Sequence, residues 1–322
     1  MIVAPRPALG VAMIFAGSCL FAVNGTVSKL VLQAGLDAPQ LTTLRATGAF
    51  LGLLLLTLMI EPRRLAVTRR ELPMLAAYGV AGFFLVPMLY FIAISRLPVG
   101  IGLLFEYTAP LLVALWARFV QGYAVRPRLW VGLALSLVGL ACVAEIWGDL
   151  RLDGIGVLAG LAAAVLLAAY FLLSERGVAS RDPLSLTTWA FGFSALAGAV
   201  ARPWWSFDAS ALDERSGGIP VWLLCAYVVV LGSIGPYLLI AGSLRHLPAT
   251  SVGIIGMIEP VLATAVAWLA LHENLNLAQL GGGALVLAGV ALAETARAKG
   301  PARGESAPTR DPRPVTDVGA AR

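Results

Sequence analysis

The stretch GIIGMIEPVL, residues 253–262, places a single carboxylate, Glu259, in an apolar run and directly before Pro260. A charged side chain at the centre of a bilayer costs about 2.5–3.5 kcal/mol on insertion scales, so such residues are rare and usually face a cavity or a partner. The proline removes a helical N–H and frees a backbone carbonyl one turn earlier, which leaves polar backbone beside the acid. A similar stretch, GLLFEYTAPL at residues 102–111, carries Glu106. We therefore expect the rest of the chain to be organised around these two segments.

The composition indicates an all-α polytopic membrane protein. Of the 322 residues, 59% are hydrophobic and 13% are charged, against about 25% charged in a typical soluble domain. The mean hydropathy is +0.85, and apolar runs of about 18 residues or more, long enough to cross a hydrocarbon core of about 30 Å, recur along nearly the whole length. A soluble enzyme is therefore excluded, and the lipid bilayer is the expected surrounding. The formal net charge of +5 does not imply a nucleic-acid partner, because in such a chain the loop charges report orientation.

Breaker residues divide the apolar sequence into ten predicted transmembrane helices. Arginine is concentrated in the connections on the side of the N-terminus and is sparse in the opposite ones, which predicts that both termini are cytoplasmic. We expect a multi-pass protein of the bacterial cytoplasmic membrane, with a disordered cytoplasmic tail at residues 296–322, which are polar and contain several prolines. The predicted helices cover about 8–32, 40–60, 73–94, 99–120, 130–148, 154–174, 184–202, 220–243, 249–270 and 277–295.

An internal repeat divides the chain into two halves. A shift of 150 residues aligns Pro110 with Pro260 together with several glycines, and slightly smaller shifts align the earlier helices. The predicted units are a first five-helix repeat, residues 1–148, and a second, residues 149–295. Because five is odd, the second must enter the membrane in the opposite orientation, which gives two inverted five-helix repeats. This architecture is typical of alternating-access transporters, whose substrate site lies between the halves near the midplane.

The repeat is broken at the two acids. Glu259 aligns with Ala109, and Glu106 aligns with Gly256. Three residues are about one helical turn, so each half directs one carboxylate to an equivalent face, displaced by a turn. This difference fits a cavity whose two sides have different roles.

Several motifs of the second half resemble a known family. The sequences IEPV at 258–261, WLALHE at 268–273 and QLGG at 279–282 are similar to the second EamA repeat of the drug/metabolite transporter superfamily. The resemblance covers both halves, although the first half has Ala109-Pro110 where the family often has Glu-Pro. It implies ten helices, no cofactor, and export or exchange of small metabolites, often amino acids or related compounds.

Glu259 and Glu106 are the first candidate site residues. A carboxylate desolvated in a cavity can bind a substrate amine, or can carry an exchanged proton at near-neutral pH and so couple transport to a proton gradient. The alternative is that each acid only fixes helix packing through hydrogen bonds. Because intramembrane acids are usually functional, function is favoured, and more strongly for Glu259.

Polar side chains near expected kinks complete the candidate set. Asn24 lies in the middle of the first helix and aligns approximately with Tyr170, while Tyr90 and Tyr237 each follow a helix-breaking proline. Amides and phenols suit the orienting wall of a ligand cavity, and interhelical hydrogen bonding is an equally weighted alternative.

Three further polar residues are expected to lie outside the site. Lys29 and Arg45 are near the outer ends of the first two helices; they could pair with a substrate carboxylate in an external vestibule, but snorkelling to the headgroups is the favoured interpretation. Tyr107 is expected to point away from Glu106 on its helix.

The favoured function is a secondary transporter, an exporter or exchanger of small metabolites such as amino acids, that works by alternating access. It would act without a cofactor or metal as a monomer or homodimer, driven by a proton or substrate gradient, since the chain has no Walker-type loop for ATP. One alternative is an intramembrane lipid-modifying enzyme, for which the two histidines and the acids lack metal-ligand spacing. Another is a non-transporting scaffold or a channel, in which paired intramembrane acids would be costly and idle.

Overall fold

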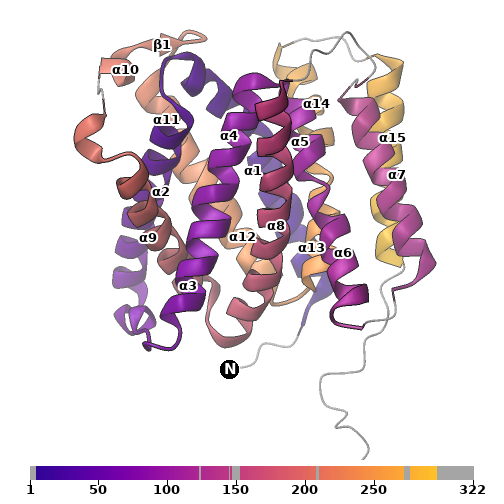
Figure 1. Ribbon diagram of the computed structural model, residues 1–322, viewed down its shortest axis with the longest axis horizontal. Helices are drawn as coiled ribbons and strands as arrows, with labels where there is room; N and C mark the ends of the chain where they lie inside the picture. Colours follow the sequence, from indigo (N-terminus) through magenta and orange to yellow (C-terminus); the bar gives the residue numbers. More distant parts are fainter. Residues whose placement is uncertain are drawn as a thin grey trace, which may run out of the picture.

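A computed structural model describes residues 5–122, 125–144, 146, 153–207, 210–271 and 276–295. The described chain is almost entirely helical, and its long helices stand side by side along one direction (Figure 1). The longest helices are α1 (Pro7–Gln33), α2 (Ala38–Ile60), α7 (Pro127–Val143), α8 (Gly154–Ser180), α9 (Pro183–Ala201) and α15 (Leu277–Thr295).

The other α-helices occur as pairs that continue one another. They are α3 (Leu72–Tyr78) with α4 (Val86–Arg96), α5 (Val99–Glu106) with α6 (Ala109–Phe119), α11 (Val221–Val229) with α12 (Gly235–Ser243), and α13 (Ala249–Gly256) with α14 (Glu259–Leu271). Short elements fill two connections: the 3-10 turn η1 (Pro62–Leu65) follows α2, and η3 (Trp204–Ser206), α10 (Ser210–Asp213), β1 (Arg215–Ser216) and β2 (Ile219–Pro220) follow α9. The two strands pair antiparallel, with Arg215 opposite Pro220.

Side-chain caps begin three of the long helices. Asp37 accepts a hydrogen bond from the Gln40 N–H at 2.7 Å, and the Gln40 side chain accepts one from the Asp37 N–H at 2.9 Å, so the start of α2 has a capping box. Asp153 and Asp182 cap α8 and α9 in the same way through single bonds. Such caps satisfy backbone donors that have no partner within the helix.

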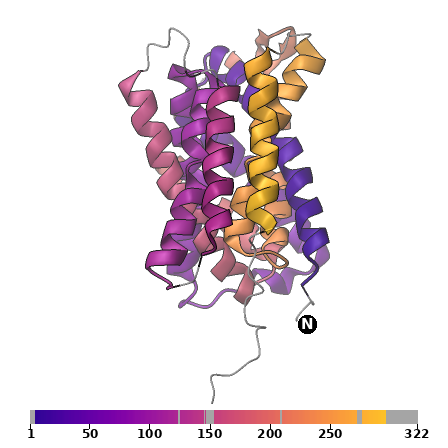
Figure 2. The same ribbon diagram turned by 90° about the vertical axis from the view of Figure 1, so that its right-hand side faces the viewer.

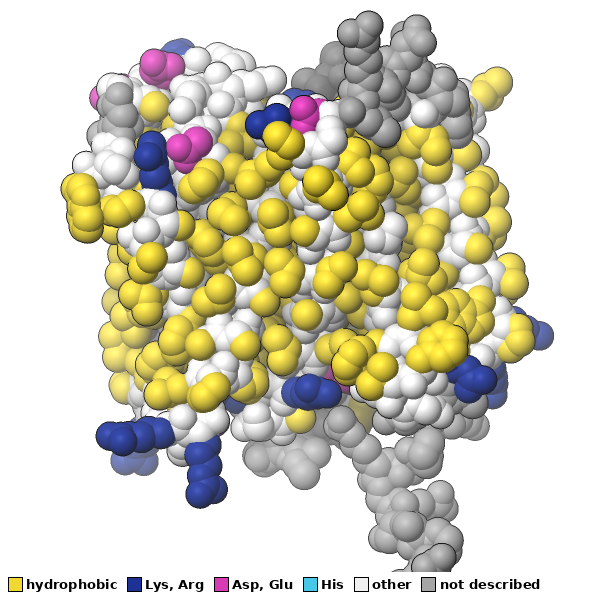
Figure 3. All heavy atoms as spheres, viewed as in Figure 1, with side chains coloured by type: hydrophobic (Ala, Val, Ile, Leu, Met, Phe, Trp, Pro, Cys, Tyr) yellow, Lys and Arg dark blue, Asp and Glu magenta, His cyan; other side chains and the backbone are white. Residues whose placement is uncertain are grey.

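The helices form an all-α polytopic membrane protein. Eight of them, counting each of the interrupted spans Leu72–Arg96, Gly100–Phe119 and Val221–Ser243 as one, are long and apolar enough to cross a membrane, and two shorter apolar helices cover Pro127–Val143 and Ala249–Ala263 among the described residues. Figure 3 shows a broad hydrophobic band around the middle of the molecule, with Lys and Arg side chains along the lower edge, where Figure 1 places the N-terminus.

Two helices that the sequence predicts as continuous are π-helical at their centres. The segment η2 (Gly79–Leu85) joins α3 to α4, and η4 (Val230–Ile234) joins α11 to α12. Each precedes a proline, Pro87 or Pro236, which lacks the N–H that would close a regular turn. The two π segments are the structural form of the kinks expected at these prolines.

Two more predicted helices are interrupted. Turns at residues 107–108 and 257–258 separate α5 from α6 and α13 from α14, within the predicted spans 99–120 and 249–270. Each turn comes just before a proline, Pro110 or Pro260, that cannot donate to the carbonyl four residues earlier. The two breaks lie 150 residues apart, the same shift that aligns the prolines.

Glycines bring α7 and α15 into close contact at one edge of the bundle, which faces the viewer in Figure 2. A Cβ atom at Gly132 would lie 2.6 Å from the Gly289 carbonyl oxygen, and one at Gly139 would lie 2.6 Å from the Gly282 carbonyl oxygen. Only a hydrogen at these positions allows the backbones to approach so closely. Elsewhere α2 packs on α9, α4 on α8 and α1 on α12, so helices from the N-terminal and C-terminal parts alternate around the centre.

Candidate functional site

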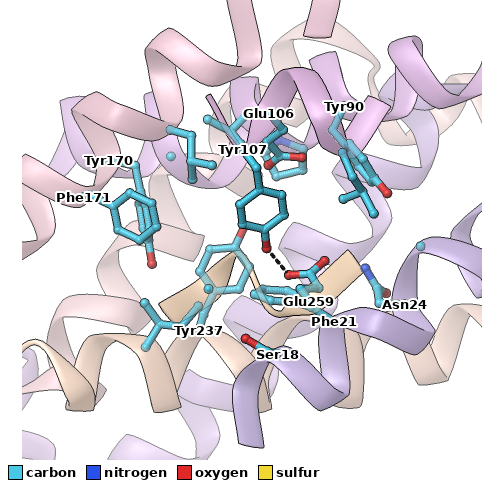
Figure 4. Close-up of a pocket in the computed structure, with 18 of the residues that line it drawn as sticks. Ser18, Phe21, Asn24, Tyr90, Glu106, Tyr107, Tyr170, Phe171, Tyr237 and Glu259 are labelled. Carbon is cyan, nitrogen blue, oxygen red and sulfur yellow. Dashed lines mark hydrogen bonds between the residues drawn. The ribbon is translucent and has the colours of Figure 1, made fainter. Parts of the chain in front are cut away.

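A pocket in the middle of the helix bundle gathers all six candidate residues from the sequence: Asn24, Tyr90, Glu106, Tyr170, Tyr237 and Glu259. It holds about 870 Å³ of space not filled by atoms, including its opening to solvent. The residues come from α1, α4, α5, α8, α12 and α14, so both parts of the chain build the walls (Figure 4). Most of the remaining lining is apolar, as is typical of a small-molecule site.

Glu259 is tied across the pocket to Tyr107. The Tyr107 hydroxyl donates a hydrogen bond to Glu259 Oε2 at 2.5 Å, drawn as the dashed line in Figure 4. The expectation that Tyr107 points away from the site is therefore wrong. An unbroken helix would turn Tyr107 about 100° from Glu106, but the chain leaves α5 at this residue, and the ring enters the pocket.

The two acids occupy opposite kinds of helix end. Glu106 is the last residue of α5, whereas Glu259 is the first residue of α14. Both side chains are only partly buried because they face the pocket. Glu106 interacts electrostatically with Glu259 and with Arg45, and no hydrogen bond to its carboxylate forms among the described residues.

Asn24 and Tyr170 lie over the glycines of the two π segments. A Cβ at Gly232 of η4 would collide with the Asn24 side chain, and a Cβ at Gly82 of η2 would collide with the Tyr170 ring. The glycines are 150 residues apart and the polar residues 146, so the two contacts correspond in the repeat. Asn24 Oδ1 and the Tyr170 hydroxyl oxygen are buried without hydrogen-bond partners within the described part of the chain.

Aromatic rings form a cluster around Tyr237, which belongs to one wall of the pocket. Its ring lies 4.4 Å from that of Phe83, 5.4 Å from Phe191 and 5.5 Å from Phe21, measured between centroids. Such edge-to-face and tilted contacts fix ring positions. This wall is therefore more rigid than one built from aliphatic side chains, and it holds the Tyr237 ring in place beside the charged groups.

Arg45 also lines the pocket, which corrects the expectation that it reaches the lipid headgroups. The residue is 3% exposed. The guanidinium carbon lies 5.4 Å from the ring centroid of Tyr237 and 5.8 Å from that of Phe191. From the sequence, a substrate carboxylate is one candidate partner of Arg45 but the headgroups are favoured, because the two aromatic neighbours of Arg45 are far away along the chain and nothing in the local sequence places it in the pocket.

The pocket thus combines two carboxylates, one guanidinium, an amide and phenols with apolar walls. Such a set can bind a small polar solute and hold a mobile proton. Within the described ranges, no group of three or more His, Cys, Asp or Glu side chains could hold a metal ion. The acid at the end of the family motif at 268–273, and the predicted tail at 296–322, lie outside the described residues.

Comparison with known proteins gives a consistent result. Residues 8–144 and 154–295 match the EamA-like transporter family. An uncharacterized transporter of Archaeoglobus fulgidus is 28% identical over 269 residues, which are 84% of this chain and 91% of that protein. The threonine/homoserine exporter RhtA of Escherichia coli K12 is 30% identical over 244 residues, 76% of this chain and 77% of that protein. A solved crystal structure has the same fold, with a TM-score of 0.72 at 20% identity over 90% of this chain and 98% of that one.

Proposed function

The chain belongs to the EamA-like transporter family, as the sequence resemblance predicts, and we propose that this membrane transporter exports or exchanges small amino-acid-like metabolites by alternating access. The observation that carries the proposal is the central pocket, where Glu106 and Glu259 face one space and the Tyr107–Glu259 hydrogen bond links its walls. A carrier needs a site that both sides of the membrane can reach in turn, and a central pocket lined by helices from both parts of the chain suits that requirement.

The proposed transporter crosses the membrane ten times, as two inverted five-helix repeats over residues 1–148 and 149–295. The glycine contacts between α7 and α15 support this arrangement because they are reciprocal. Each contact joins one residue to a distant partner, and adding and subtracting 150 converts the pair Gly132–Gly289 into the pair Gly282–Gly139. A two-fold axis between the halves produces such reciprocal contacts. The paired π segments and paired breaks support it in the same way.

The two acids have different roles in this proposal. Glu259 begins α14, where the partial positive charge of a helix N-terminus stabilises a carboxylate, and it also accepts the Tyr107 hydrogen bond. Glu106 ends α5, where the partial negative charge of the helix C-terminus disfavours the negatively charged form of its carboxylate. We assign the substrate ammonium group to Glu259 and the exchanged proton to Glu106.

Relatives and charge distribution guide the choice of substrate and location. Because relatives at about 30% identity are named threonine/homoserine exporters, neutral amino acids are the first substrates to test. The cationic lower edge of the molecule (Figure 3) supports a cytoplasmic position for the N-terminus. We place the protein in the bacterial cytoplasmic membrane with both termini inside.

Counterflow in proteoliposomes tests the proposal. Vesicles holding purified protein and unlabelled L-threonine or L-homoserine would be diluted into labelled amino acid, and transient accumulation of label would be measured over a range of concentrations. A carrier gives accumulation that saturates with substrate. Flux that rises linearly without saturation would indicate a channel, and the absence of flux for threonine, homoserine and the other neutral amino acids would contradict the assigned substrate class.

A further inference from the structure

Arg45 is a buried cation without an ion-pair partner among the described residues. It lies on α2 and is 3% exposed, and its Nε and Nη2 atoms are buried without any hydrogen-bond partner among the described residues. The ion pairs of the described chain do not include it, so no carboxylate there approaches it within 4.0 Å. A desolvated charge without a partner is costly and is retained where it has a task.

The surroundings of Arg45 leave two of its nitrogen atoms unpaired among the described residues. The guanidinium carbon lies 5.4 Å from the Tyr237 ring centroid and 5.8 Å from that of Phe191, within the range of cation–π contacts. The N–H donors of a guanidinium lie in its plane and match a carboxylate in bidentate geometry. The group is therefore positioned to receive an anion from the pocket.

Arg181, in the same molecule, is a partly buried arginine whose guanidinium has several hydrogen-bond partners. Its side chain is 10% exposed, and its guanidinium donates to the Glu71 carboxylate, to the Ser185 hydroxyl and to two backbone carbonyls. Arg45 is buried, yet it pairs with no carboxylate of the described residues, and its Nε and Nη2 atoms have no hydrogen-bond partner there. The difference separates an arginine that ties segments together from one that faces a cavity.

We infer that Arg45 is the carboxylate-binding subsite of the pocket and that the transported solute is a zwitterion whose ammonium group faces the acids. Arg45, Glu106 and Glu259 line one space, and the charge on Arg45 acts on Glu106 without a direct ion pair. Opposite charges on different walls match the two ends of an α-amino acid, and charge-assisted hydrogen bonds would hold each end. The inference rests on the proposed transport function and adds the residue that selects for the carboxylate.

The test uses the full chain in proteoliposomes with three variants. Counterflow of L-threonine would be measured for wild type, Arg45→Gln, Arg45→Lys and the control Arg202→Gln, with L-threoninol, which has no carboxylate, as a competitor. Arg202 is a suitable control because its guanidinium pairs with Asp37 at 3.4 Å and does not line the pocket. Each variant would first be checked for a monodisperse peak in detergent.

We expect Arg45→Gln to raise the KM for threonine about 10–100-fold, which is the loss expected for charge-assisted hydrogen bonds. Arg45→Lys, which keeps the charge without the planar fork, should raise it less, and Arg202→Gln should leave it unchanged. Threoninol should compete weakly with threonine in wild type. If Arg45→Gln does not fold, Arg45→Lys decides, because an unchanged KM in that variant together with strong competition by threoninol would overturn the inference.

The experiment distinguishes a failure of the carboxylate subsite from a failure of the proposed transport function. If wild type transports threonine, but Arg45→Gln has the same KM or threoninol competes as well as threonine, the carboxylate subsite is wrong while the transporter proposal stands. If wild type transports none of the neutral amino acids, the proposed function fails and the inference falls with it.

Discussion

The two broken helices, α5–α6 and α13–α14, are the most instructive pair of regions in the molecule. Their breaks and prolines correspond, yet the acid precedes the break at Glu106 and follows it at Glu259. The structure gives a packing reason. Ala109, which corresponds to Glu259, is fully buried, while Gly256, which corresponds to Glu106, lines the pocket. Of the two corresponding positions, only Glu106 lines the pocket in the first half, whereas both Gly256 and Glu259 line it in the second.

The same comparison has an electrostatic consequence. The break creates a helix C-terminus and a helix N-terminus in each half, and these ends have opposite partial charges. Because one acid lies at each kind of helix end, the negative charge is stabilised on Glu259 and disfavoured on Glu106. In the proposed transport cycle, this difference allows one acid to bind the substrate and the other to bind a proton, which two equivalent acids would not.

The largest expected effect comes from making the first half like the second. Ala109→Glu would place a carboxylate in the closed core and should destabilise the protein by about 3 kcal/mol or more, since a buried unpaired charge has no compensation. Gly256→Glu makes the second half like the first, but a Cβ there would meet only the Tyr107 ring, at 3.7 Å. We expect a much smaller loss for this variant. Apparent Tm in detergent measures both, and equal losses would refute the packing explanation.

A smaller effect is expected at the two π segments. Gly82→Ala should cost about 1–3 kcal/mol, because Tyr170 cannot retreat from the added methyl: its ring is stacked on Tyr78 at 5.5 Å and packs against Phe83 and Phe171. Gly232→Ala should cost less, because Asn24 is shorter and can rotate.

Gly281→Ala is the matched control for these glycine variants, since nothing lies within 4 Å of a Cβ there. In thermal unfolding, the apparent Tm of Gly82→Ala should be lower than that of Gly232→Ala, and both should be lower than that of Gly281→Ala. The reverse order of the first two variants would show that the aromatic contacts of Tyr170 do not hold its ring more firmly than Asn24 is held.

The candidate site was partly predictable from the sequence. Two prolines 150 residues apart, each with an acid one to four residues before it, point to Glu106 and Glu259, and the structure places both in one pocket with Asn24, Tyr90, Tyr170 and Tyr237. Arg45 and Tyr107 were not predictable by this route. The position of Arg45 depends on rings from α9 and α12, and the direction of Tyr107 depends on a helix break that apolar periodicity does not encode.

The fold, too, was only partly predictable from the sequence. Helix ranges follow from apolar run length and breakers, because both are local properties of the chain. The π segments and the breaks depend on how a freed carbonyl finds a partner in the folded bundle, so they are not readable from hydropathy. Contacts between helices such as α7 and α15 depend on glycines that are far apart in the sequence. The 150-residue repeat aligns these glycines but does not show that the two helices touch.

The smallest effect concerns the connections outside the membrane. In the first half, hydrogen bonds from Thr68 and then from the Arg181 guanidinium hold the pKa of Glu71 below its ordinary value of 4.5. At the corresponding connection of the second half, the ion pair is the exposed one between Arg202 and Asp37. Because the folded-state pKa is lowered, the Glu71 contribution is present above pH 4.5 and is lost as the pH falls through the folded-state value.

Glu71→Gln should therefore lower stability by about 1 kcal/mol or less at pH 7 and should match wild type under strongly acidic conditions. Arg202→Gln should have a still smaller effect. Unfolding at several pH values in detergent measures this, and a Glu71→Gln deficit that persists unchanged in acid would show that its cause is not the charge.

The most direct test of the asymmetric pocket is L-threonine transport by Glu259→Gln and Glu106→Gln in proteoliposomes, measured both as exchange and as flux driven by a pH gradient. We expect Glu259→Gln to lose both activities, because the substrate ammonium group loses its partner. We expect Glu106→Gln to keep exchange and lose the response to the gradient. If both variants lose the same activity, the two acids are equivalent; if both match wild type, the acids are structural and the transport site lies elsewhere.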